Sequence, residues 1–473
     1  MSTVEGIGAL APLSASPQFD DDRARGAISA TLQAFDATVD EAWTNPDGIL
    51  RHLRQRDPVH WSDVEAAWIV TRHDDAMTVL RDEGRFSSDA RIANGGAGAT
   101  VRALAEASPI PYDSLLSTSG GADHARLRRA AAAAFAPAPV EELREPIRQA
   151  AARLLAAAPV EGFDFVAGFA EPLSLQVTLQ LLGVEPRRQA LVARLADLVI
   201  AATQFGAASG VTREAAERAG EDLARLIDGE LGASVAPSSL LASLLEARAD
   251  GSLSRDDVLG LVVFVSTVGQ APTVFALGNA VLALLRLPDQ LALVRQDRGL
   301  IANLLDEAVR FDPPVRVIRR FAIGDTALRG RQARAGDQVQ VIVTAVNRDP
   351  GVFVDPNRFD VRRGARNHLG FGWSSHHCLG APVARVIAEE GLALLLDGYP
   401  ELAAAGRLEL LTGETAGPRA LDLVGRAGTP RRLLEAAERH GIVHRSVAEA
   451  GRNDACPCGS GRKHKHCHGG RGG

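Results

Sequence analysis

Cysteine is scarce in this chain. There are four in 473 residues, and three of these fall within the last eighteen. A small secreted domain held together by disulfides would carry many closely spaced cysteines, so a disulfide framework is excluded and a reducing cytoplasm is favoured. Each of the four cysteines therefore needs its own explanation.

Export and membrane signals are also missing. No basic residue precedes the apolar stretch within residues 1–19, as a secretory signal peptide would require. The longest apolar region, residues 259–285, is interrupted by Gln270, Pro272 and Asn279, whereas a spanning helix needs about 20 predominantly apolar residues. We expect a buried central helix there, in a cytoplasmic protein with no membrane contact.

Neither sign of charge dominates the bulk of the chain. The 58 acidic residues against 52 Lys and Arg give a net charge of −6, without a basic stripe, so nucleic acid is an unlikely partner. Hydrophobic residues make up 46% and charged residues 23%, which are globular values that exclude wholesale disorder. A small neutral substrate suits this composition better.

Hydrophobic patterning predicts a mainly α fold. Apolar residues recur at three- and four-residue spacing from 123 to about 310, in a stretch dominated by Ala, Leu and Arg. Short β-type runs predict strands at 59–61 and 67–71, a helix over 74–80, and a further strand at 338–343. The class is therefore mainly α with a minor sheet.

The composition divides the chain into four parts. Residues 1–38 read as an irregular leader, 39–430 as one main domain, 431–451 as a linker helix, and 452–473 as a separate short module. The last part is packed with Gly, Cys, His, Lys and Arg. No internal repeat suggests a solenoid.

Cys378 lies in a glycine-bearing loop just before a helical pattern. A thiolate at a helix N-terminus is stabilised by free amides and the helix dipole, although a lone cysteine there is equally well a small buried hydrophobe. The loop nevertheless resembles the haem-binding loop of the cytochrome P450 family, in which the cysteine thiolate is the axial iron ligand. The matching residues are Phe371-Gly372, His376, Cys378, Gly380 and Ala384-Arg385.

The resemblance extends over roughly residues 40–430. It implies the cytochrome P450 fold, haem b (iron protoporphyrin IX) as the cofactor, and an oxidoreductase of the monooxygenase class. Ser374 and Val383 stand where the family usually has Gly and Leu, but neither change removes a ligand.

A second motif supports the resemblance. Glu307 and Arg310 are three residues apart, so they share one helical face; at this spacing most such pairs are solvated surface pairs. Here Phe311-Asp312-Pro313-Pro314 follows, as in the family's ExxR helix. By resemblance Arg358 is the third member of a buried structural triad.

The resemblance also assigns contacts to the haem propionates. His124 and Arg128 lie one helical turn apart, a spacing that can present two donors to one anion or form an ordinary basic face. In the family they bind a propionate, with Arg320 and His376 adding further contacts. A one-residue slip would replace Arg320 with Arg319.

The family's proton relay is missing from the central helix. The segment reads Val268-Gly269-Gln270-Ala271-Pro272-Thr273, with Ala271 in place of the usual acid and Pro272 in place of the usual threonine. Neither can act as a general acid, and Pro272 should push away the carbonyl of Val268 and open the helix. The alternative is that these two positions changed by neutral drift in a tolerant helix. Gln270 could position a water or simply pack in the helix.

Three reaction types stay open: the substrate handles the proton, peroxide replaces oxygen and reductant, or the oxidation is a coupling or ring closure. No flavin, nicotinamide or ferredoxin-like module occurs in the sequence, so electrons would come from a separate redox partner (ferredoxin and reductase). We expect a small or carrier-bound metabolite, as in natural-product biosynthesis. Arg316 or Arg319 could hold a substrate carboxylate, although an outward-facing arginine is the commoner case.

The C-terminal module gathers three cysteines and several histidines in a short segment. Soft thiolates plus one imidazole form a tetrahedral zinc set, and without metal so polar a segment could not fold. The spacing is similar to the SEC-C motif, a small zinc-bound interaction module that suits a protein partner; a basic tail without metal, or a reversible disulfide, is the alternative. The expected zinc ligands are Cys456, Cys458, Cys467 and His468.

The sequence thus predicts a haem-thiolate oxidoreductase with atypical oxygen activation. The alternative is a haem-binding but catalytically reduced protein that recruits a partner through its zinc tail.

Overall fold

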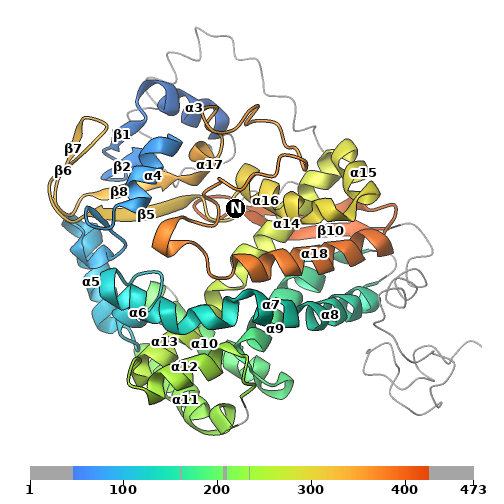
Figure 1. Ribbon diagram of the computed structural model, residues 1–473, viewed down its shortest axis with the longest axis horizontal. Coiled ribbons are helices and arrows are strands. Elements are labelled where there is room, and N and C mark those ends of the chain that lie inside the picture. Colours follow the sequence, from blue (N-terminus) through green and yellow to red (C-terminus); the bar gives the residue numbers. More distant parts are fainter. Residues whose placement is uncertain (1–45, 160–161, 206–209, 234, 426–473) are drawn as a thin grey trace, which may run out of the picture.

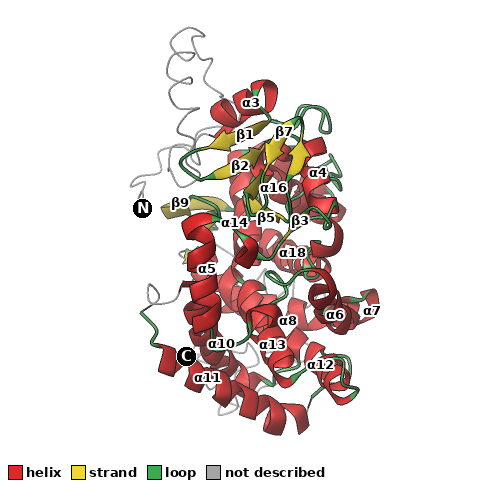
Figure 2. Ribbon diagram, turned by 90° about the vertical axis from the view of Figure 1, so that its left-hand side faces the viewer, coloured by secondary structure: helices red, strands yellow, loops and turns green. Residues whose placement is uncertain are grey.

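The computed structural model describes residues 46–425, apart from 160–161, 206–209 and 234. Helices fill most of this part, while strands gather into small sheets (Figures 1 and 2). The predicted class, mainly α with a minor sheet, is confirmed. The predicted leader, linker helix and C-terminal module fall outside the described residues.

Most of the helices from α6 to α16 follow one another with short connections, whereas strands and long loops separate α16, α17 and α18. The first group is α3 Pro46–Arg56, α4 His73–Arg81, α5 Gly95–Ala107, α6 Gly121–Ala132, α7 Pro137–Glu142, α8 Arg144–Ala157, α9 Glu171–Leu182 and α10 Pro186–Phe205. The second group is α11 Arg213–Leu226, α12 Leu240–Ala249, α13 Arg255–Val268, α14 Ala271–Arg286, α15 Pro288–Gln296, α16 Ile301–Phe311, α17 Val343–Val346 and α18 Ala381–Gly398. One π-helical turn, Val166–Ala170, leads into α9, and another, Ile227–Leu231, follows α11.

A five-stranded sheet forms one side of the molecule, beside α3 and α4 (Figure 1). Its strands, in spatial order, are β1 Val59–Ser62, β2 Ala67–Val70, β8 Gln338–Ile342, β5 Val317–Ala322 and β3 Phe86–Ser87. Only β2 and β8 pair in parallel within this sheet. The strands and helix predicted near residues 59–80 and 338–343 are confirmed.

Two smaller sheets were not predicted. A three-stranded sheet has the order β4 Phe163–Asp164, β10 Gly417–Val424 and β9 Ala403–Leu411, and β6 Thr326–Leu328 pairs with β7 Arg331–Ala333. The sequence of β9 begins with three alanines and ends Leu-Glu-Leu-Leu, which are good helix formers. Pairing with β10 therefore overrides the local preference.

The main hydrophobic core lies among the helices, and α16 packs against both α14 and α18 within it. Every residue of α16 from Leu304 to Phe311 is buried, including Asp306, Glu307 and Arg310. Each buried leucine stabilises the fold by about 1.5–3 kcal/mol, so polar groups in this helix require partners. A smaller core lies between α4 and the five-stranded sheet.

Helix α13 begins at a capping box in which Ser254 and Asp257 each accept the other's backbone N–H, at 3.0 and 2.8 Å. The stretch Arg255–Arg286, which comprises α13 and α14, is long and apolar enough to cross a membrane, by length and composition alone. Half of its most apolar window is buried inside the protein, as in a core helix.

Candidate functional site

Cys378 lies three residues before α18, where the sequence places a thiolate. Its backbone N–H donates to the carbonyl of Phe371 at 2.8 Å, which closes the loop on itself. Gly372 has φ +71°, and a Cβ there would lie 2.9 Å from the carbonyl oxygen of His376, so the turn requires glycine. The side chain of Cys378 is accessible.

Opposing influences act on the Cys378 thiol. Burial raises its pKa, because the thiolate loses hydration, whereas the amides of Gly380 and Ala381 and the guanidinium groups of Arg128 and Arg385 act to lower it. Amides and cations around it are the environment in which a thiolate is held ready for a metal.

Four basic side chains predicted to bind propionates come together beside this loop. The rings of His124 and His376 stack with their centroids 3.8 Å apart, and Arg128 Nη2 donates to the carbonyl of His377 at 2.7 Å. Arg320 is 6% exposed and acts electrostatically on both histidines. His124 and Arg128 come from α6, Arg320 comes from β5, and His376 comes from the loop that carries Cys378 (residues 371–380, the thiolate loop), as expected.

Cations outnumber anions in this cluster: among the described residues, the Glu83 carboxylate acts electrostatically on His124 and Arg320, and its effect is outweighed by burial. Burial, followed by the neighbouring cations, lowers the pKa of His124 and lowers that of His376 to about 3, and burial lowers the pKa of Arg320 to about 10. Among the described residues, the buried Nε2 of His124 has no hydrogen-bond partner. A cofactor with two carboxylates would supply the missing charge and acceptors, so the residues present fit a haem.

Ser88 is a site residue that sequence reasoning missed. Its hydroxyl donates to the carbonyl of Ser119 at 3.0 Å and lies 3.1 Å from Nε2 of His376. Ser88 is therefore within hydrogen-bonding distance of both the Ser119 carbonyl and the His376 ring. Serine is too common in loops for any sequence signal to have pointed to it.

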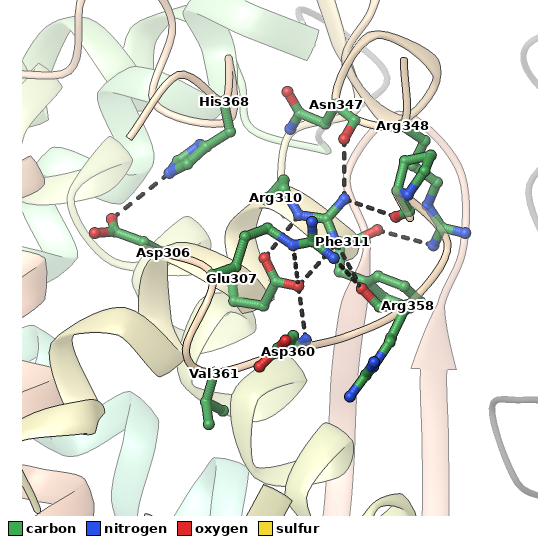
Figure 3. A network of polar contacts seen from close by, with 12 residues as sticks. Asp306, Glu307, Arg310, Phe311, Asn347, Arg348, Arg358, Asp360, Val361 and His368 are labelled. Atoms are coloured by element: carbon green, nitrogen blue, oxygen red, sulfur yellow. Dashed lines mark hydrogen bonds and ion pairs between the residues drawn. The ribbon is translucent and has the colours of Figure 1, made fainter. Parts of the chain in front are cut away.

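The ExxR pair is buried and fully paired (Figure 3). Glu307 and Arg310 are each 0% exposed, and Arg310 donates through Nε and Nη2 to the carboxylate at 2.7 and 2.8 Å. Arg310 also donates to the carbonyls of Asn347, Pro356 and Arg358 at 3.0, 2.8 and 3.2 Å. Helix α16 is thereby tied to the segment that leads to Cys378.

The predicted third member of the triad is wrong. Arg358 contributes only its carbonyl, and its exposed side chain points away from Glu307 (Figure 3). Arg363 takes the role instead: its Nε donates to Glu307 Oε1 at 3.1 Å, and its Nη2 donates to the carbonyls of Asp355 and Arg358 at 3.0 and 2.8 Å. A loop can present either arginine, and spacing along the chain could not decide between them.

The central helix is interrupted at the expected place. Helix α13 ends at Val268 and α14 begins at Ala271, with Pro272 in its first turn. Pro272 has no N–H, so no helical amide can donate to the carbonyl of Val268. Val268, Gly269 and Ala271 are exposed within a helix pair that is otherwise largely buried. The predicted opening of the helix is therefore confirmed.

The polar side chains at the break are tied to backbone carbonyls. The Gln270 amide donates to the carbonyl of Ser266, which favours its packing role over one in positioning water. Thr267 and Thr273 donate to the carbonyls of Val263 and Gly269 at 2.9 and 3.0 Å. Positions 271 and 272 themselves carry neither a carboxylate nor a hydroxyl, and the buried hydroxyl of Ser266 on α13 has no partner among the described residues.

Ser174 of α9, which the sequence did not single out, also holds the break. Its hydroxyl lies 3.5 and 3.4 Å from the carbonyls of Gly269 and Gln270. The interruption is thus supported by a neighbouring helix.

The two arginines considered for a substrate carboxylate are placed differently. Arg319 pairs with Glu414, in the turn between β9 and β10, and Arg316 is buried, with a pKa lowered by that burial. Neither is an unpaired cation at the surface. The expected zinc ligands lie outside the described residues, and within the described part no group of His, Cys, Asp or Glu could hold a metal ion.

Comparisons with known proteins agree with this geometry. A family model for cytochrome P450 matches residues 230–400, and one for the SEC-C motif matches residues 452–470. The chain is 31% identical over 366 residues to cytochrome P450 CYP107DY1 of Priestia megaterium, covering 75% of this chain and 88% of the relative. It is 34% identical over 361 residues to the cytochrome P450 monooxygenase PikC of Streptomyces venezuelae, covering 74% and 83%.

A solved structure shares the fold as well. The cytochrome P450 enzyme CxnD, for C–S bond formation in chuangxinmycin biosynthesis, superposes with a TM-score of 0.71 at 26% identity, covering 82% of this chain and 96% of that one. With relatives matched over three quarters of its length, the chain belongs to the cytochrome P450 family of haem-containing monooxygenases and carries a SEC-C motif near its C-terminus.

Proposed function

We propose that this cytochrome P450 is a haem-thiolate oxidase of small or carrier-bound metabolites that works without the acid–threonine relay. The observation that carries the proposal is the accessible Cys378 thiol just before α18, beside two buried and two half-buried basic side chains whose positive charge outweighs that of the nearby Glu83 carboxylate. Cys378 is the proposed iron ligand.

Each group has a proposed role. Arg128 and Arg320 supply charge to the haem propionates, and His124 and His376 supply ring donors, because two buried carboxylates would otherwise be costly. Phe371 packs beside the thiolate. When bound, the haem supplies oxidation at an unactivated carbon, which no side chain can perform.

A carbon monoxide difference spectrum of the reduced full-length protein tests the assignment. The thiolate-ligated band should be present, and Cys378→Ser should abolish it while the fold persists, because a hydroxyl is a poor and largely protonated iron ligand. An unchanged band in Cys378→Ser would show that another residue ligates the iron.

The proton path is proposed to differ from that of the usual enzyme. Ala271 and Pro272 carry no acid, and the nearby hydroxyls of Thr267 and Thr273 are bonded to the backbone. The proton-handling group then comes from the substrate, or the oxidant is peroxide, or the reaction closes a ring or forms a new bond. The C–S bond formation named for CxnD is an example of the last kind in a similar protein.

Turnover assays separate these routes. The protein should be given a metabolite library with ferredoxin and reductase, and separately with peroxide, and product formed per reductant or peroxide consumed should be measured. Product from neither oxidant supply would favour the alternative of a haem-binding, catalytically reduced protein. We propose a natural-product pathway as the setting, as in the chuangxinmycin biosynthesis named for CxnD, and a cytoplasmic location.

The SEC-C motif is proposed to bind one zinc through Cys456, Cys458, Cys467 and His468. Three thiolates and an imidazole fill a tetrahedral site, so the metal is structural and the module serves a protein partner. Metal analysis of the purified chain should find about one zinc beside the haem iron.

A further inference from the structure

A second buried carboxylate lies next to Glu307 on α16 and takes no part in the site as described so far. Asp306 is 0% exposed. Arg385 donates through Nε and Nη2 to Oδ1 at 3.1 and 2.9 Å, and Arg366 Nη1 lies 2.8 Å from Oδ2. His368 Nε2 is 3.6 Å from Oδ1. Three basic side chains therefore converge on one carboxylate.

The two carboxylates of this turn serve different segments. Figure 3 shows Glu307 directed at Arg310 and at the backbone of Asp360, whereas Asp306 points the other way, toward His368. The N–H of Gly370 donates to Nδ1 of His368 at 3.2 Å, so the ring proton is on Nε2, facing Asp306. Asp306 thus orients this ring.

Two partners of Asp306 contact the ring of Phe371, which belongs to the loop that carries Cys378. Arg385 lies over the ring of Phe371 at 5.1 Å, and the His368 ring centroid lies 5.5 Å from that of Phe371. The carbonyl of Phe371 in turn accepts the N–H of Cys378 at 2.8 Å. Asp306 therefore contacts Arg385 and His368, and both of these contact the Phe371 ring. The backbone carbonyl of Phe371 completes the connection to the amide of Cys378.

Helix α16 also touches the residue directly before this loop, Gly370, without intervening space. A Cβ on Gly370 would overlap Cγ1 of Val309 and lie 2.8 Å from the Val309 carbonyl oxygen. Movement of the helix is therefore transmitted to the loop, and the charges near Asp306 lie in a packed region where screening is weak.

We propose that Asp306 is a positioning residue for the Cys378 loop, and that the balance of its charge with Arg385 and Arg366 sets the reduction potential of the bound haem iron. The inference rests on the proposed thiolate ligation by Cys378. Reduction adds one electron to the haem, so a nearby negative charge opposes it and a nearby positive charge favours it.

Two substitutions of opposite sign test the charge effect. Asp306→Asn removes the buried negative charge at nearly constant shape, so the midpoint potential of the haem should rise. Arg385→Gln removes a positive charge from the same cluster, so the potential should fall. Potentials are measured by spectroscopic redox titration of the full-length haem protein, together with the carbon monoxide band.

A second pair of substitutions keeps the test decisive if a buried variant does not fold. Arg366 is 58% exposed, and Arg366→Gln should fold and lower the potential by a smaller amount that shrinks as salt is added. Arg362 is exposed and four residues earlier, and Arg362→Gln removes the same charge without touching Asp306. This control should leave the potential unchanged.

The outcomes are distinct. Shifts of opposite sign in Asp306→Asn and Arg385→Gln, or a fall in Arg366→Gln without one in Arg362→Gln, support the proposal. Shifts in the same direction, or none, overturn it, since a purely structural role would damage the thiolate band in both buried variants alike. If the unmodified protein lacks the thiolate band, it is the ligation by Cys378 that fails.

Discussion

At the scale of single residues, the sequence motifs predicted which groups lie close together. They did not always decide which of two nearby arginines makes a given contact. His124, Arg128, Arg320 and His376 converge as expected, because the spacing of a helix turn and a motif around Cys378 constrain them. Arg363 replaces Arg358 because both lie in an irregular segment, where no periodicity fixes side-chain direction.

The substitution Arg363→Gln should destabilise the protein by about 1–3 kcal/mol, because Glu307 loses a charged hydrogen-bond partner in a buried setting. Arg358→Gln should cost no more than about 0.5 kcal/mol, since its carbonyl stays in place. Urea unfolding of both variants measures the difference. Equal costs would return Arg358 to the triad.

Acid should destabilise the haem-free protein through His124. Burial holds the pKa of this ring below its ordinary value of 6.5. Between the folded and unfolded pKa values, the ring is therefore protonated in the unfolded chain and neutral in the folded chain. Its contribution to stability is therefore complete above pH 6.5 and is lost as the pH falls from there toward the folded pKa. Thermal unfolding measured over this pH range checks the prediction: His124→Gln should flatten this part of the pH dependence, and an unchanged dependence would contradict it.

At the scale of elements, the break between α13 and α14 could be predicted because proline acts locally and its effect needs no tertiary information. The contacts of Ser174 with this break could not be predicted, because Ser174 lies on α9, nearly a hundred residues earlier in the chain. The sheet of β9 and β10 was missed for a different reason: the residues of β9 are good helix formers, and only pairing with β10 makes this segment a strand.

Restoring the acid–threonine relay should change the amount of product formed per reductant consumed. Ala271→Asp together with Pro272→Thr provides an acid and a hydroxyl, and should raise product formed per reductant with a generic substrate that carries no acidic or hydroxyl group. The same change should impair a natural substrate that occupies the space at Val268. High coupling on the generic substrate in the unmodified protein would instead indicate neutral drift at these positions.

At the scale of the whole molecule, two metal sites are expected in separate modules. The haem site draws on residues of the described part, whereas the SEC-C motif begins at residue 452, well after β10 ends at Val424. Two modules with separate ligand sets should lose their metals independently.

A zinc chelator, or Cys456→Ser with Cys458→Ser, should release about one zinc per chain and leave the haem spectrum unchanged. Metal analysis and absorption spectra on the same sample provide the check. A haem spectrum that changes in step with zinc loss would mean that the two modules are coupled, and iron alone in the purified chain would refute the zinc site.

The paired carboxylates of α16 restrict how the chain can change in length. Each residue along a helix turns the side chain by about 100°, so a single insertion or deletion that shifted α16 by one position would carry Asp306 and Glu307 away from both sets of partners at once. The short 3₁₀ turn Arg298–Leu300 that precedes the helix is itself held, because Arg298 pairs with Asp397 of α18 at 2.7 Å. The registry of this one helix is therefore fixed from two directions by the partners of its two carboxylates.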